Sequence, residues 1–122
     1  MSRALLFAGA IVMALAVAAG AASLHAAKSA VHPEAARLLQ TAVLYQLIHG
    51  LALALEGTLA RIAPSKLLAA AGILHLCGVV AFSGSLYLLA FTGVSLGAVG
   101  PAGGIAFIAG WLALAAYAVR SR

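Results

Sequence analysis

Polar and ionisable side chains interrupt the second of four long apolar stretches, and their spacing places them on one face of a helix. At about 100° per residue, four of them fall within an arc of roughly 100°; they are Tyr45, Gln46, His49 and Glu56. Ionisable groups inside a bilayer cost about 2.5–3.5 kcal/mol on insertion scales, so this face should point toward protein or water. It offers a polar surface for a proton, an ion or a ligand.

The same face also has a structural explanation, which is the commoner one for such residues. Gln46 and His49 can hydrogen-bond to neighbouring helices and hold them together. Glu56 lies only five residues before Arg61, which fits a position at the headgroup level. Interhelical hydrogen bonding therefore ranks ahead of transport as the role of this face.

A further histidine lies at a matching depth in the third apolar stretch. His75 comes nine residues after Lys66, and His49 comes twelve before Arg61. In an antiparallel hairpin, a rise of 1.5 Å per residue puts the two imidazoles within about 5 Å of the same depth. Paired histidines can ligate haem iron or a transition metal. Such a site also needs facing rings and a porphyrin cavity, so an interior contact is the commoner outcome.

The other reactive side chains predict no catalytic or metal site. His25 and His32 lie near the opposite membrane surface, where a polar loop is several times commoner than a metal site. Ser83 and Ser85 have no His or Asp partner at useful spacing, so a serine nucleophile is not supported. Cys77 is the single cysteine and forms no intrachain disulfide. We expect no enzyme activity, no metal and no cofactor.

The elements that must position these residues are four transmembrane helices. The apolar stretches cover roughly residues 4–26, 34–60, 66–92 and 101–119. About 20 mainly apolar residues span a bilayer as a helix. With 66% hydrophobic residues, 7% charged residues and a mean hydropathy of +1.17, a soluble globule is excluded. Residues 1–122 are therefore predicted to form one all-α domain, an integral membrane four-helix bundle.

The N-terminal stretch resembles a signal peptide but is predicted to be a retained helix. Arg3 gives a basic start, and Ala19-Gly20-Ala21 resembles a cleavage site. The apolar run continues past that site to about Ala27. We therefore interpret it as the first membrane span.

The basic residues predict the orientation. Five of them fall on one side of the membrane and two on the other. The larger set is Arg3, Arg61, Lys66, Arg120 and Arg122, and the smaller is Lys28 and Arg37. Both termini are therefore predicted to be cytoplasmic. The charges lie at the ends of apolar segments, so nucleic acid is not expected as a partner.

Rows of small residues predict where helices approach closely. The first stretch has alanine at every fourth position from residue 10 to residue 26, and the fourth has a matching Gly/Ala row. Such rows let helix backbones pack together in lipid. The predicted packing residues are Ala14, Ala18, Gly104, Ala106 and Gly110. These rows favour a compact bundle or contacts with a partner.

Three segments together resemble a known family. They are residues 41–49 (TAVLYQLIH), 82–89 (FSGSLYLL) and 100–104 (GPAGG), the last followed by Phe107, Gly110 and Trp111. They resemble the small four-helix membrane proteins called YgdD-like or transmembrane-protein-256-like, a domain of unknown function. The chain departs from that pattern at Gly100, where threonine is usual, and at His75, where an aromatic residue is usual.

The resemblance implies the fold and a bacterial inner-membrane location, but it transfers no reaction. By elimination, the sequence predicts a non-catalytic scaffold or accessory subunit that acts through helix contacts. Its expected partners are membrane lipids and either further copies of itself or a larger membrane complex. One alternative is a small proton- or ion-conducting unit that uses the polar face of the second helix. A further alternative is haem or metal binding through His49 and His75.

Overall fold

The computed structural model describes residues 1–29 and 32–120. Its helices are α1 (Ser2–Ser29), α2 (Ala35–Ile62), α3 (Lys66–Gly78), the π-helical segment η1 (Val79–Ser83), α4 (Gly84–Thr92) and α5 (Val99–Arg120). Segments α3, η1 and α4 form one continuous apolar span, Lys66–Thr92. Together with α1, α2 and α5 this gives four helices long and apolar enough to cross a membrane, which confirms the predicted all-α membrane fold.

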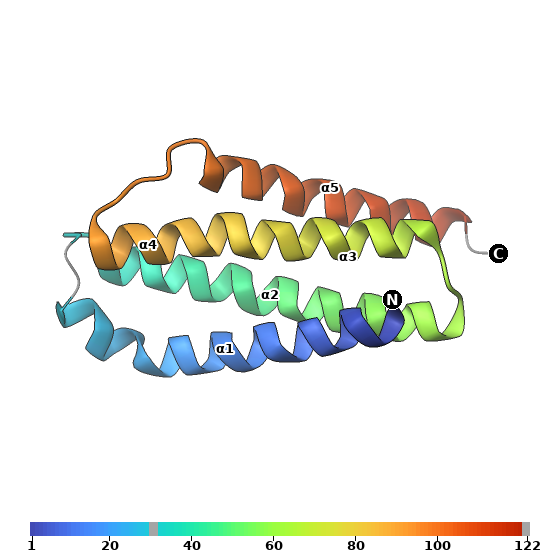
Figure 1. The fold of residues 1–122 in the computed structure, drawn as a ribbon, viewed down its shortest axis with the longest axis horizontal. Coiled ribbons are helices and arrows are strands. Elements are labelled where there is room, and N and C mark those ends of the chain that lie inside the picture. The colour runs from blue at the N-terminus through green and yellow to red at the C-terminus, as the bar shows by residue number, and fades with distance from the viewer. Residues whose placement is uncertain (30–31, 121–122) are drawn as a thin grey trace.

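The helices are arranged around a central hairpin. Helix α2 packs against α3, η1 and α4, while α1 covers α2 on one side and α5 covers α3 and η1 on the other (Figure 1). Both ends of the drawn chain lie at the end of the bundle where α2 is joined to α3 (Figure 1). This topology places Arg3, Arg61, Lys66 and Arg120 at one end of the bundle, as the sequence predicts, while Arg122 of the same predicted set lies outside the described residues.

Helix α1 approaches α2 through glycines. A Cβ added to Gly9 would lie 2.6 Å from the backbone nitrogen of Ala54, and one added to Gly57 would lie 2.5 Å from that of Leu6. No side chain fits at either point, so these glycines let the two backbones touch. The buried residues of α1 follow the same face and are Leu5, Gly9, Val12 and Ala16.

The predicted alanine row of α1 lies outside this contact. Ala14 and Ala18 are exposed in the single chain, so their role in packing stays a prediction. On α5, Gly110 is buried, while Gly104 and Ala106 are half-buried. Gly110 faces α3, where an added Cβ would lie 2.4 Å from the His75 ring.

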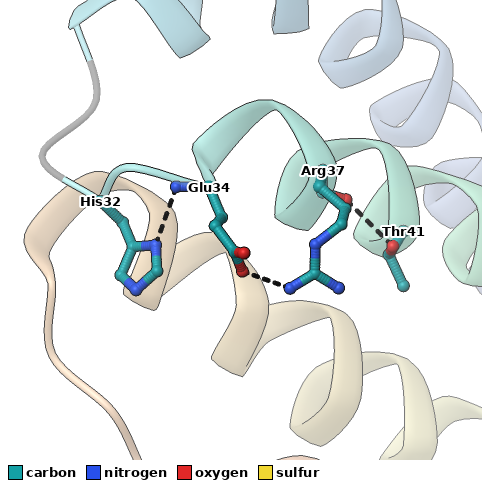
Figure 2. Close-up of polar contacts among 4 residues, drawn as sticks. All are labelled: His32, Glu34, Arg37 and Thr41. Atoms are coloured by element: carbon teal, nitrogen blue, oxygen red, sulfur yellow. Dashed lines mark hydrogen bonds and ion pairs between the residues drawn. The ribbon is translucent and has the colours of Figure 1, made fainter.

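Polar groups at the start of α2 organise the connection from α1. The backbone N–H of Glu34 donates to His32 Nδ1 over 3.2 Å, and Glu34 pairs with Arg37 (Figure 2). Thr41 donates its hydroxyl to the carbonyl oxygen of Arg37 over 3.0 Å. The hydrogen bond and the charge of the Arg37 guanidinium hold the pKa of the exposed Glu34 carboxyl below its ordinary value.

The third span contains the π-helical segment η1, which follows directly after α3. A π turn widens an α-helix by one residue and is often found at functional sites. At its end the buried Ser83 hydroxyl donates to the carbonyl oxygen of Ala42 over 2.8 Å, which ties this segment to α2. The spacing of apolar residues did not predict this irregularity.

Candidate functional site

Glu56 and His75 form an ionisable pair inside the bundle. Glu56 on α2 and His75 on α3 are both 0% exposed, and Glu56 Oε1 lies 2.8 Å from His75 Nδ1. The side chain of Glu56 therefore turns into the bundle and not toward its outer surface. We call these two residues the Glu56–His75 pair.

The hydrogen-bonding capacity of this pair is not used by the surrounding protein. Both Glu56 oxygens and both His75 nitrogens are buried, and none makes an aligned hydrogen bond within the described residues. Buried polar groups are nearly always hydrogen-bonded, because an unpartnered one loses its hydration without compensation. The close approach of Glu56 Oε1 to His75 Nδ1 is therefore the one polar contact that the described residues give this pair.

His49 lies beside the pair but has both of its nitrogens engaged. Its ring centroid is 5.2 Å from that of His75. Its Nδ1 is 2.7 Å from the carbonyl oxygen of Tyr45, and its Nε2 is 3.1 Å from the Nε1 of Trp111. An indole N–H can only donate, so Nε2 must accept. The proton of the neutral ring is then on Nδ1, where it donates to Tyr45.

Aromatic rings enclose this centre. Phe107 stacks on His49 with ring centroids 3.5 Å apart and planes 10° apart, and Trp111 lies 5.0 Å from the His75 ring. Both residues come from α5, which reaches α3 because Gly110 has no side chain at the contact with His75. The rings exclude solvent and lower the local dielectric, which strengthens electrostatic interactions within the centre.

Gln46 belongs to a separate and fully bonded network. Its Nε2 donates to the carbonyl oxygen of Val12 over 3.1 Å, and its Oε1 accepts from the Tyr87 hydroxyl over 2.7 Å. These bonds join α1, α2 and α4. We call this set the Gln46 network, and it performs the interhelical bonding that the sequence suggested for Gln46.

Two apolar grooves reach these centres from the lipid-facing surface. One, of about 590 Å³, lies between α2 and α5 and is bordered by Tyr45, His49, Phe107 and Trp111. The other, of about 340 Å³, lies between α1, α2 and α4 and is lined in part by Gln46 and Tyr87.

The structure separates the predicted site residues into distinct groups. His49, Glu56 and His75 come together, Gln46 joins another network, and Tyr45 is 37% exposed and stacks near Phe82 and Phe107. His25 is exposed and lies away from the centre. The partnership of Glu56 with His75 was missed, although the depth of His75 in the hairpin falls between those of Glu56 and His49. The bond between Trp111 and His49 was missed as well.

The haem alternative does not fit this geometry. The His49 nitrogens are hydrogen-bonded, its ring is covered by Phe107, and the His75 ring is in direct contact. No porphyrin fits between rings at this separation. Among the described residues, no three His, Cys, Asp or Glu side chains are grouped as a metal ion would require.

Comparisons with known proteins identify similar chains. The profile of the family described as "Protein of unknown function (DUF423)" matches residues 19–104. A UPF0382 membrane protein of Staphylococcus haemolyticus is 40% identical over 107 residues, with 87% of each chain covered. The UPF0382 membrane protein YwdK of Bacillus subtilis is 38% identical over 114 residues, covering 92% of this chain and 93% of its own. No solved structure matches.

Proposed function

We propose that this chain, which belongs to the DUF423 family of proteins of unknown function, binds and transfers protons within the membrane. The relatives to which it is similar are named membrane proteins. The site is the Glu56–His75 pair. One observation carries the proposal: a carboxyl and an imidazole lie 2.8 Å apart, fully enclosed, inside two apolar spans.

The chemistry of the pair suits a single mobile proton. A glutamate and a histidine in contact share one proton as an ion pair or as a neutral acid and base, and a second proton makes the pair cationic. Ionisable residues inside membrane spans commonly form proton relays. A buried ion pair is weak evidence for a stabilising role, because apolar replacements are often as stable or more so.

The pair has two further atoms, besides those in contact, that can accept a proton. Glu56 Oε2 and His75 Nε2 are buried and hold no aligned hydrogen bond within the described residues. The His49 ring, in contact with His75, is the next group along the centre. A proton entering the pair therefore meets free acceptor positions, which a purely structural network would have filled.

Proton flux into liposomes tests this proposal. The purified protein is reconstituted with a pH-sensitive dye inside, and a potassium diffusion potential drives proton entry. Wild-type protein should acidify the lumen faster than empty liposomes do. Glu56→Gln should lose most of that flux, whereas Glu34→Gln, which neutralises the exposed glutamate before α2, should keep it. A wild-type rate equal to that of empty liposomes would refute the proposal.

A non-catalytic scaffold or accessory subunit is the second candidate. The observation that favours it is the exposed alanine row of α1, including Ala14 and Ala18, which the packing of α1 on α2 leaves uncovered. Small residues on a lipid-facing helix suit close contact with another copy or a partner helix. Ala14→Leu should then reduce the native mass of the assembly, and an unchanged mass would exclude this surface.

We further propose the bacterial inner membrane as the location, from the bacterial relatives, with both termini in the cytoplasm, which is the orientation that the basic residues favour. Single cysteines at Ser2 and Ser65, in a Cys77→Ala background, should be protected from an impermeant reagent in intact cells. A cysteine at Ser29 should be labelled. Labelling of Ser65 with protection of Ser29 would reverse the orientation.

A further inference from the structure

Trp111 holds the hydrogen-bonding position of His49 that faces α5. Its Nε1 donates to His49 Nε2 over 3.1 Å, while the opposite nitrogen of the same ring donates to the carbonyl oxygen of Tyr45. The two partners have opposite character, one a donor and the other an acceptor. Only the neutral tautomer with its proton on Nδ1 satisfies both.

Protonation of His49 would break this arrangement. A proton on Nε2 would face the indole N–H, so one donor would meet another and Trp111 would have to move away. The titratable groups that face His49 are His75 from α3, backed by Glu56, and Tyr45 from its own helix. Helix α5 presents the uncharged rings of Phe107 and Trp111. Of these, only the indole blocks Nε2 directly.

We propose that Trp111 is a positioning residue that occupies Nε2 of His49, whose Nδ1–H is already held by the Tyr45 carbonyl oxygen, and so keeps His49 out of proton exchange with the Glu56–His75 pair. The effect on proton exchange rests on the proposed function. The tautomer of His49 does not, because the hydrogen bonds alone determine it. When Trp111 releases Nε2, His49 becomes the acceptor for a proton leaving His75.

The surroundings of Trp111 give it room to move. Its side chain is 42% exposed, whereas His49 is 3% exposed and Phe107 is also 3% exposed. It borders the groove of about 590 Å³ between α2 and α5. The indole can therefore swing into the groove while His49 stays packed under Phe107, so a change at Trp111 need not disrupt the core.

Nitrogen NMR of ¹⁵N-histidine protein in lipid bilayers tests the tautomer. The His49 signals are assigned by their loss in His49→Gln. Wild-type protein should show a neutral His49 with Nδ1 protonated and Nε2 bare. An Nε2–H tautomer in the wild-type protein would overturn the inference.

Trp111→Phe removes the donor and keeps an aromatic ring. The proton of His49 should stay on Nδ1, because the Tyr45 carbonyl oxygen still accepts it, while the Nε2 signal should shift because its hydrogen-bond donor is lost. Leu112→Phe, at the exposed neighbouring position of α5, should leave the His49 signals unchanged. Unchanged His49 signals in Trp111→Phe would refute the role of Trp111.

Proton flux separates this inference from the proposed function. If both hold, Trp111→Phe should raise flux into liposomes several-fold over wild-type protein. If the NMR result holds but the wild-type protein passes no protons, the proposed function fails and the tautomer assignment stands. If the wild-type protein passes protons and Trp111→Phe passes them at the same rate, Trp111 does not control proton exchange between His49 and the Glu56–His75 pair.

Discussion

The Gln46 network and the Glu56–His75 pair share helix α2, where Gln46 and Glu56 lie ten residues apart, yet their polar atoms are hydrogen-bonded to very different extents. Gln46 donates to Val12 and accepts from Tyr87, so its amide is bonded at both ends. The pair is more deeply buried and has no aligned hydrogen bond within the described residues. A satisfied network holds helices together, whereas an unsatisfied ionisable pair carries a burial cost that structure alone does not offset.

The largest expected effect comes from breaking the pair on one side. His75→Leu leaves the Glu56 carboxyl buried without a partner, which should lower the stability in detergent by about 3–5 kcal/mol. The double variant Glu56→Leu with His75→Leu should recover that loss, because no buried charge remains. Thermal unfolding of the two variants checks this. If the double variant is as unstable as the single one, the Glu56–His75 pair stabilises the fold, as the Gln46 network does.

A smaller effect should follow from filling the contact between α5 and His75. A Cβ at Gly110 would lie 2.4 Å from His75 Nε2, and the enclosed ring has to shift. Overpacking of this kind costs about 1–3 kcal/mol, so Gly110→Ala should melt at a lower temperature and disturb the pair. At Gly104 the nearest atom to an added Cβ is 3.9 Å away, so Gly104→Ala is the matched control and should keep its stability. Equal melting temperatures would show that the close packing on His75 has no energetic weight.

Loss of one bond from the Gln46 network should have a still smaller effect. Tyr87→Phe removes the hydroxyl that donates to Gln46 Oε1 and changes little else. Interhelical hydrogen bonds in membranes average about 0.6 kcal/mol and reach about 1.7. The melting temperature should fall slightly while proton flux stays at the wild-type level. If Tyr87→Phe loses proton flux, the Gln46 network takes part in proton transfer together with the Glu56–His75 pair and is not purely structural.

The smallest effect belongs to the exposed Glu34–Arg37 pair at the start of α2 (Figure 2). Because Arg37 lowers the pKa of Glu34 in the folded protein, any stabilisation is present above the ordinary value of 4.5 and is lost as the pH falls below it. Glu34→Gln should therefore leave the melting temperature at neutral pH nearly unchanged, as exposed pairs contribute little. A marked loss of stability at neutral pH, absent under acidic conditions, would contradict this.

Hydropathy and length were enough to predict the four helices. The number of residues between each histidine and the turn joining the second and third helices was enough to predict that His49 and His75 lie at a similar depth. The rotation of each helix was harder to predict, because all faces of a membrane helix are apolar and periodicity does not mark the buried one. The sequence therefore pointed to an alanine row on α1, whereas the contact with α2 runs through Gly9 and Gly57.

The details of the polar centre depended on the same missing information. The inward rotation of α2 buries Glu56 against His75, and the π-helical segment follows directly after α3. The bond between Trp111 and His49 needs the position of α5, which close packing at Gly78, Gly103 and Gly110 sets. None of these follows from residue spacing within a single helix.

Infrared difference spectroscopy of the protein in bilayers tests most directly whether the Glu56–His75 pair exchanges a proton. Acidification should produce a carboxylic acid C=O band together with a change in the histidine ring bands. The part of the acid band that arises from Glu56 should be lost in Glu56→Gln and kept in Glu34→Gln, which removes only the contribution of the exposed Glu34. If no band depends on Glu56 across the whole pH range in which the protein stays folded, the pair holds its proton permanently and is not a site of proton transfer.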